Sequence, residues 1–234
     1  MRTGILCAGD TEAAPFIRML DKSGTVEKAM LTFYEGKIDG AEVVVLFSGV
    51  CKVNAAIAAQ ILIDTFKCEA IINAGTAGGI DKELRVFDTV VSTETAYHDV
   101  GESILTDFHP YMDSVYFPSD KNLLAAAEKA ALRFGTEKRV FFGRVVTGEQ
   151  FIEQDRREYL SRRFSPLSAD METAGAAHAC YVNRIPFISV RTITDTAEYD
   201  GTDQFEKNCA EASEIAAEFV RLMIEELHSA VSLR

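Results

Sequence analysis

The segment CEAIINAGTAGG, residues 68–79, joins a short apolar run directly to glycine and other small residues. A short apolar run that ends at glycine is typical of a buried strand followed by a turn. The segment FISVRTITD, residues 187–195, has the same form with an acid at its end, because Asp195 closes the apolar run. Both segments predict strands inside a sheet, with chemistry-bearing residues where the strands end.

Similar patterns extend in both directions from these two segments. Runs of β-branched and aromatic residues predict further strands at 3–8, 30–34, 43–48, 89–92 and 139–146, and turn chemistry at 37–40 favours a hairpin. Helical spacing of apolar and small residues predicts helices at 12–20, 53–66, 123–134, 155–163, 173–182 and 204–228. Strands thus alternate with helices, which predicts one α/β domain over residues 1–234 with a mixed central β-sheet flanked by helices.

Composition places the chain among ordinary globular proteins. Its 234 residues are 47% hydrophobic and 26% charged, and the formal net charge is -12. That charge disfavours nucleic acid, whose phosphates need a basic surface, and it does not suit an anionic membrane. It is compatible with an acidic protein whose substrate is small and neutral or zwitterionic.

The cysteines and the N-terminal residues predict a cytoplasmic protein. The five cysteines are odd in number and form no CxxC pair, so we interpret them as small core residues in a reducing compartment. The first apolar run stops at Asp10, too soon for a signal peptide, and no run has the length of a membrane span.

The segment 97–120 has the least regular pattern. It carries two histidines together with several tyrosines, phenylalanines and prolines. A long aromatic loop in a compact domain is often a binding loop or lid. A surface loop held by its own aromatic side chains explains the pattern equally well.

Acids and glycines stand where the predicted strands end. They are Glu12, Glu172 and Asp195, with the glycine run 75–79. Each has a structural explanation: the glutamates can stabilise helix N-termini, Asp195 can form an Asx turn, and the glycines can form a tight turn. The glycine run lacks the Lys-Ser/Thr of a P-loop. Together these residues predict an α/β enzyme with its site at the strand ends.

The combination of motifs is more specific than any one of them. The motifs are, in order, IINAGTAGG (71–79), YHD (97–99), GEQFI (148–152), ADME (169–172) and VRTITD (190–195). In this order they resemble the nucleoside phosphorylase/hydrolase superfamily, and within it the bacterial 5′-methylthioadenosine/S-adenosylhomocysteine nucleosidases. The resemblance runs from Gly4 to the C-terminal helix, and it implies a nucleoside phosphorylase-like fold.

The resemblance implies roles on the ribose side of a purine nucleoside. Glu12 matches the acid that, with Glu172 and Arg191, holds and polarises the attacking water. Met171 and Glu172 are expected against the ribose, with the Glu172 carboxylate accepting from its hydroxyls. Thr76 stands where the family usually has serine, and it is expected to hydrogen-bond near the ribose or the water.

On the base side, the resemblance implies that Asp195 protonates or hydrogen-bonds purine N7. Phe151 is expected to stack on the base and the Ile152 backbone to read its Watson–Crick edge. Ala77 and Gly78 complete the expected substrate-binding residues. No cofactor and no metal is expected. The four histidines are scattered, and His178, among small helical residues, is interpreted as packed or hydrogen-bonded.

These roles suit the chemistry of N-glycosidic cleavage. The ribose gains positive charge, as in glycoside hydrolysis, and the leaving purine gains negative charge. Carboxylates beside the sugar stabilise the cation, and an acid at N7 neutralises the base. Asp195 is therefore expected to carry a proton in the reactive complex.

The residues after the first strand favour hydrolysis over phosphorolysis. The resemblance implies that phosphorolytic relatives bind phosphate with an arginine there and with a second one just before the hydroxyl residue of the glycine run. Here residues 9–16 hold Asp10 and Glu12, Arg18 lies further along, and Asn73 occupies the second region. A carboxylate repels phosphate and suits water, so the expected products are adenine and the 5-thioribose, as in methionine salvage.

Two departures leave the 5′ substituent open. Gly9 stands where the nucleosidases usually have methionine, and residues 99–118 do not repeat the family's usual sequence. In the family this segment comes partly from a neighbouring subunit, which implies a homodimer, and Phe108, Pro110, Tyr111 and Phe117 are candidates for the 5′ pocket. The alternatives are another purine nucleosidase, such as a futalosine-type enzyme, a phosphate-dependent phosphorylase, and a nucleoside-binding sensor without activity.

Overall fold

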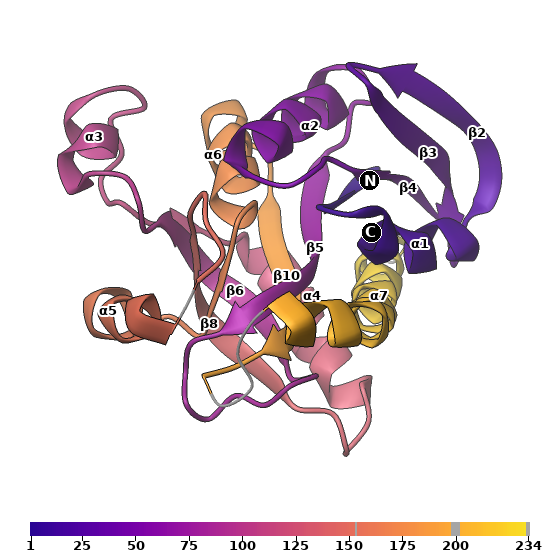
Figure 1. The fold of residues 1–234 in the computed structure, drawn as a ribbon. Helices are drawn as coiled ribbons and strands as arrows, with labels where there is room; N and C mark the ends of the chain where they lie inside the picture. The colour runs from indigo at the N-terminus through magenta and orange to yellow at the C-terminus, as the bar shows by residue number, and fades with distance from the viewer. Residues whose placement is uncertain (153, 198–201, 233–234) are drawn as a thin grey trace.

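The computed structural model describes residues 1–152, 154–197 and 202–232, and it has a mixed β-sheet with helices on both sides (Figure 1). The strands are β1 (Thr3–Cys7), β2 (Asp21–Lys28), β3 (Leu31–Ile38), β4 (Ala41–Phe47), β5 (Ala70–Gly79), β6 (Thr89–Tyr97), β7 (Phe117–Pro118), β8 (Val140–Thr147), β9 (Ser168–Asp170) and β10 (Phe187–Asp195). The helices are α1 (Asp10–Met19), α2 (Lys52–Asp64), α3 (Glu102–Asp107), α4 (Lys121–Arg133), α5 (Gln154–Phe164), α6 (Thr173–Asn183) and α7 (Thr202–Ser232). The mixed sheet flanked by helices that the sequence predicts is confirmed.

The sheet closes on itself over part of its width. Its strand order is β10-β6-β8-β9-β5-β1-β4-β3-β2, and β10 also pairs with β5. Strands β10, β6, β8, β9 and β5 therefore form a ring, from which β1, β4, β3 and β2 continue as an open sheet. Because β5 runs parallel to both β1 and β10, the carboxyl ends of these three strands meet at one edge.

Two apolar layers hold the helices on the sheet. On one side, Phe16 of α1 and Phe219 of α7 are buried with residues of β1, β4 and β5. On the other side α2 and α6 pack through alanines, and a Cβ at Gly175 would lie 2.5 Å from the Lys52 carbonyl oxygen. Gly175 thus lets α6 approach α2 closely. As a result, α6 meets the sheet at its N-terminal end, where Glu172 stands.

Two local expectations are corrected, and one further strand is found that the sequence did not predict. The glycine run 75–79 is not a turn: it continues β5, because its bare backbone pairs with β10 and, at residues 78–79, with β9. Residues 21–28 form β2, an edge strand. Most of its residues are polar, so the sequence pattern does not indicate a strand there. The segment 97–120 is not all loop, since it contains α3 and β7, and Figure 1 shows α3 projecting from the body. In the described part of the chain, no helix is long and apolar enough to span a membrane.

Candidate functional site

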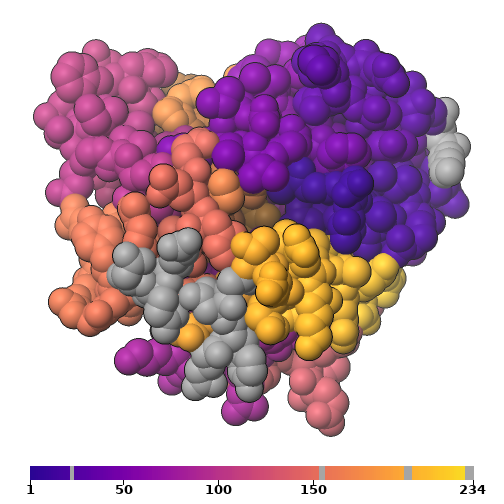
Figure 2. Space-filling model, viewed as in Figure 1, coloured from indigo at the N-terminus to yellow at the C-terminus, as the bar shows by residue number. Residues whose placement is uncertain are grey.

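A cavity of about 390 Å³ lies at the edge where β1, β5 and β10 end. In the space-filling view the N-terminal part of the chain and α7 lie next to each other on this side (Figure 2), and residues of both line the cavity. The lining residues named in the sequence analysis are Gly9, Asp10, Glu12, Thr76, Ala77, Gly78, Phe151, Ile152, Met171, Glu172 and Asp195. Residues far apart in the sequence are thus brought together as expected.

Glu12 is held from four directions. It is buried near the start of α1, and its Oε1 accepts from the Thr76 N–H at 2.7 Å and the Thr76 hydroxyl at 2.8 Å. Its Oε2 accepts from the N–H groups of Ala8 at 2.8 Å and Gly9 at 3.1 Å. The bond from Gly9 is the helix-start interaction that the structural explanation of Glu12 predicts. The same carboxylate also faces the cavity.

Gly75 makes room for this carboxylate. A Cβ at Gly75 would lie 2.4 Å from Glu12 Oε1, far inside van der Waals contact. Glycine at this position therefore allows the Glu12 side chain to lie against β5.

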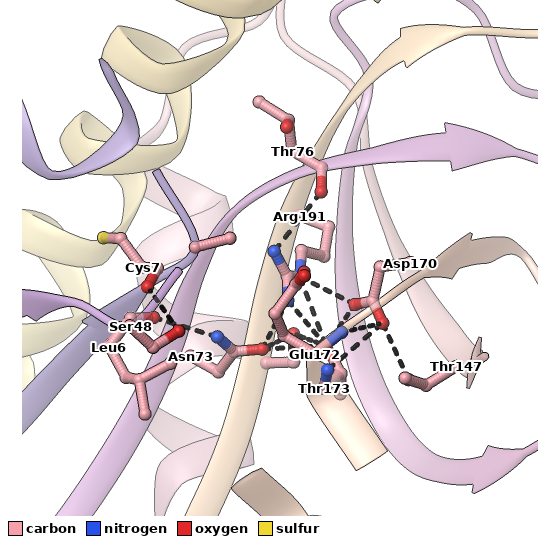
Figure 3. Close-up of polar contacts among 12 residues, drawn as sticks. Leu6, Cys7, Ser48, Asn73, Thr76, Thr147, Asp170, Glu172, Thr173 and Arg191 are labelled. Atoms are coloured by element: carbon pink, nitrogen blue, oxygen red, sulfur yellow. Dashed lines mark hydrogen bonds and ion pairs between the residues drawn. The ribbon is translucent and has the colours of Figure 1, made fainter. Parts of the chain in front are cut away.

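Arg191 is a completely buried cation. Figure 3 shows it within a group of polar contacts that includes Asn73, Thr76, Asp170 and Glu172. Its Nε is 2.9 Å from Asp170 Oδ2, one Nη donates to Asn73 Oδ1 at 2.5 Å, and the other donates to the Thr76 carbonyl at 3.3 Å. Burial opposes its charge, but Asp170, Glu172 and Glu12 outweigh burial and raise the pKa of Arg191. It does not line the cavity; it supports the residues that do.

Glu172 stands at the start of α6 with its carboxylate 3.7 Å from Arg191. Its Oε1 accepts from the Cys51 N–H at 2.9 Å. Burial raises the pKa of Glu172 to about 7, Arg191 opposes the shift, and Asp170 adds to it. A carboxyl with such a pKa can exchange its proton near neutral pH, as catalytic acids and bases do.

Asp195 ends β10 and is bound to an arginine that sequence reasoning missed. Its Oδ2 lies 2.5 Å from Nη2 of Arg157 on α5, and its Oδ1 accepts from the Thr194 hydroxyl at 2.9 Å. Arg157 and Asp195 are both buried and both line the cavity. The segment QDRR (154–157) carries no signal of this role, since its charges are typical of a solvent-exposed helix.

Aromatic and apolar residues form the rest of the wall. Phe151, 38% exposed, packs edge-to-face on Phe205 of α7 with ring centroids 6.5 Å apart. Phe205 and Cys209 also line the cavity and were missed, because in the sequence they belong to the amphipathic pattern of a long helix. Ile152 is buried beside them.

The four 5′-pocket candidates do not line this cavity. Phe108 and Tyr111 are exposed on the projecting segment, and Phe117 is buried. Phe117 stacks on His178, whose Nδ1 is 3.1 Å from the Tyr97 hydroxyl, so the interpretation of His178 as packed and hydrogen-bonded is confirmed. Among the described residues, no cluster of His, Cys, Asp and Glu is placed to hold a metal ion.

Known proteins share both the sequence and the fold. The family model described as the phosphorylase superfamily matches residues 2–225. The 5′-methylthioadenosine/S-adenosylhomocysteine nucleosidase of Colwellia psychrerythraea is 34% identical, over 99% of this chain and 98% of the relative. A crystal structure of the nucleosidase from that organism with adenine matches with a TM-score of 0.89 at 32% identity, over 97% of this chain and 96% of the other. The Neisseria meningitidis nucleosidase with methylthio-immucillin-A matches with a TM-score of 0.88 at 29% identity, over 96% and 98%.

Proposed function

Because the chain belongs to the phosphorylase superfamily, and within it to the 5′-methylthioadenosine/S-adenosylhomocysteine nucleosidases, we propose that it hydrolyses the N-glycosidic bond of 5′-methylthioadenosine or S-adenosylhomocysteine. The products are adenine and the corresponding 5-thioribose. The observation that carries this function is that Glu12, Glu172 and Asp195 line one cavity, at the ends of different elements.

On the ribose side, Glu12 and Glu172 are the groups that stabilise positive charge. Glu12 accepts the proton of the attacking water as that water bonds to C1′, and Glu172 accepts hydrogen bonds from the ribose hydroxyls. Met171 packs against the sugar, and Thr76 holds Glu12 through two hydrogen bonds. Arg191 balances this negative charge from below, where solvent does not reach.

On the base side, Asp195 gives a proton to N7 as the bond between C1′ and N9 breaks. The electron pair of that bond stays on the purine, so protonation neutralises the leaving group. Phe151 stacks on the base, the Ile152 backbone reads its edge, and Ala77 and Gly78 form the floor. The adenine in the Colwellia psychrerythraea structure is consistent with such a site in this family.

Water is favoured over phosphate by the charges of the cavity. Its described lining includes the carboxylates of Asp10, Glu12 and Glu172, and its cation, Arg157, is bound to Asp195. Asn73, in the region where phosphorolytic relatives place an arginine, is buried and accepts from Arg191. Among the described lining residues, a phosphate dianion would therefore meet carboxylates, and the arginine there is already bound to one of them.

The decisive experiment measures adenine release from both nucleosides with and without phosphate. Equal rates in both buffers, with free 5-thioribose as the sugar product, are expected. A strict need for phosphate, with a sugar 1-phosphate as product, would contradict hydrolysis. Tight binding of adenosine analogues without release of base would point instead to a sensor. A panel of nucleosides with different 5′ groups then identifies the preferred substituent, including that of futalosine.

We further propose that the chain is one domain that acts as a cytoplasmic homodimer in methionine salvage. Exposed Phe108 and Tyr111, on the segment that carries α3, support a partner subunit that covers them. Sedimentation equilibrium is expected to give twice the mass of the chain. The double variant F108S/Y111S is expected to shift the equilibrium to monomer, and an unchanged dimer would reject this surface as the interface.

A further inference from the structure

Arg157 occupies a position in α5 that is unfavourable for a cation. It lies in the first turn of α5, where the helix dipole disfavours a cation, and it is only 4% exposed. A buried guanidinium in such a place needs specific partners. Among its partners are residues of two different strands: Nη2 is 2.5 Å from Asp195 Oδ2, and Nη1 donates to the Gly79 carbonyl.

The pair is built into the cavity wall. A Cβ at Gly78 would lie 3.1 Å from Asp195 Oδ2 and 3.7 Å from Arg157 Nη1, so the pair packs on bare backbone. Among the described residues, the other titratable groups lining the cavity are Asp10 and Glu12 on α1, Asp170 on β9, Glu172 before α6 and Cys209 on α7, and Arg191 on β10 lies beneath them. Among the described lining residues Arg157 is thus the cation, and its guanidinium contacts Asp195.

An arginine in this position affects the acid rather than replacing it. A guanidinium does not give up a proton in proteins, so Arg157 cannot protonate N7 itself. A neighbouring cation favours the charged form of a carboxyl group. Yet transfer of a proton to N7 requires Asp195 in its neutral form.

We propose that Arg157 is a positioning residue that keeps Asp195 ionised while the cavity is empty, so that Asp195 gains its proton only as a purine binds. The inference rests on the proposed function, in which Asp195 is the acid at N7. The entering base separates Arg157 from Asp195, and the carboxylate takes one proton from solvent. That proton passes to N7 as the C1′–N9 bond breaks, and the carboxylate left behind pairs with Arg157 again as adenine leaves.

Two uncleavable ligands isolate the proton on Asp195. One is the carbocyclic analogue of 5′-methylthioadenosine, which lacks the ring oxygen that stabilises the ribosyl cation. The other is its 7-deaza counterpart, which lacks N7 and demands no proton there. Titration calorimetry at pH 7 in buffers of different ionisation enthalpy gives the proton uptake of each. Any proton taken up by Glu172 or Glu12 is common to both ligands and cancels in the difference.

For the wild type we expect the carbocyclic analogue to take up about one proton more than the 7-deaza analogue. In Arg157→Gln the buried carboxyl loses the guanidinium that lies 2.5 Å away, so the difference is expected to fall below about half a proton. The affinity ratio of the two ligands is expected to shift toward the carbocyclic analogue about tenfold, the equivalent of one pKa unit. Arg157→Lys keeps a cation and is expected to restore wild-type behaviour.

The controls separate this inference from the proposed function. Arg162→Gln removes an exposed arginine of the same helix, paired with Glu158, and is expected to change nothing. Arg157→Met, which is apolar and of similar length, carries the same expectation as Arg157→Gln should that variant not fold. Equal proton uptake from both ligands in a wild type that releases adenine overturns the inference alone, as does an unchanged affinity ratio in both variants. A wild type that releases no adenine overturns the function.

Discussion

Both donors of Thr76 converge on one carboxylate oxygen of Glu12, the N–H at 2.7 Å and the hydroxyl at 2.8 Å. The other oxygen accepts from two backbone N–H groups at the end of β1. The two carboxylate oxygens of Glu12 can only accept hydrogen bonds, and four donors surround them. These four bonds define one orientation of the side chain. Glu12, the proposed water-activating group, is thereby held by three backbone N–H groups and by the hydroxyl of buried Thr76.

Glu12→Gln is expected to lower kcat by about 10²–10⁴-fold. The amide NH2 must face donors on one side or the other, so one hydrogen-bond pair becomes a donor–donor contact costing about 1–3 kcal/mol. Adenine release and thermal unfolding are the measurements. Glu94→Gln, which breaks an ion pair with Arg144 outside the cavity, is the matched control and is expected to stay within twofold of wild-type activity, in the range of surface substitutions. Comparable loss in both variants would contradict the role of Glu12.

Gly75→Ala tests the same carboxylate by steric means. Its Cβ would lie 2.4 Å from Glu12 Oε1, so Glu12 must move, and activity is expected to fall about 10²-fold or more, as for a misplaced catalytic group. Gly24→Ala is the control, because a Cβ there meets nothing within 4 Å. If both alanine variants turn over at the wild-type rate in the adenine-release assay, the position of Glu12 is not essential.

Asp195→Asn is expected to lower kcat by about 10²–10⁴-fold, because an amide cannot transfer a proton to N7. It also removes the carboxylate that lies 2.5 Å from the buried Arg157 guanidinium, so the variant is expected to be less stable than the wild type. Asp88→Asn offers a matched control: Asp88 is a buried aspartate 3.6 Å from Arg139 and lies outside the cavity. Circular dichroism checks the fold, and loss of activity in Asp88→Asn alone would reverse the assignment.

Glu172 predicts a pH dependence of stability with a definite sign. Burial raises its pKa from 4.5 in the unfolded chain to about 7, so between these values the folded state binds more protons. The stabilising effect of that proton is complete below pH 4.5 and is lost as pH rises through 7. The neutral variant Glu172→Gln lacks this dependence.

Urea unfolding of the wild type and Glu172→Gln at pH 5 and pH 8 measures the effect. The wild type is expected to lose stability relative to the variant on going to pH 8, by up to about 3 kcal/mol. A constant difference between the two proteins across this range would show that Glu172 titrates as an ordinary exposed glutamate.

The positions of the central strands β5 and β10 were predictable because their apolar runs are local signals. The runs at 70–74 and 187–193 are buried, as strands inside a helix-covered sheet are, and their largely apolar composition predicts that position. The acids that follow β1 and β10 then had to meet at one edge. The sequence alone therefore places Glu12 and Asp195 in one predicted site.

Other features depend on contacts that no local pattern encodes. The glycine run 75–79 looks like a turn, yet pairing with β10 and β9 extends it as a strand. The polar sequence of β2 suits its place at the sheet edge, where one side needs no apolar residues. Arg157 belongs to a charged stretch, and only the approach of α5 to β10 turns one of those charges inward.

The burial of Arg191 has an electrical consequence. Because its side chain has no solvent-exposed surface, dissolved ions do not contact it, and its field on Glu172 and Asp170 is only weakly screened. The counter-charge of the site is thus internal to the protein, and the substrate is itself uncharged or zwitterionic. We therefore expect turnover to vary little with ionic strength. Changes in the salt concentration of the cell are expected to leave the chemistry at this strand edge unaffected.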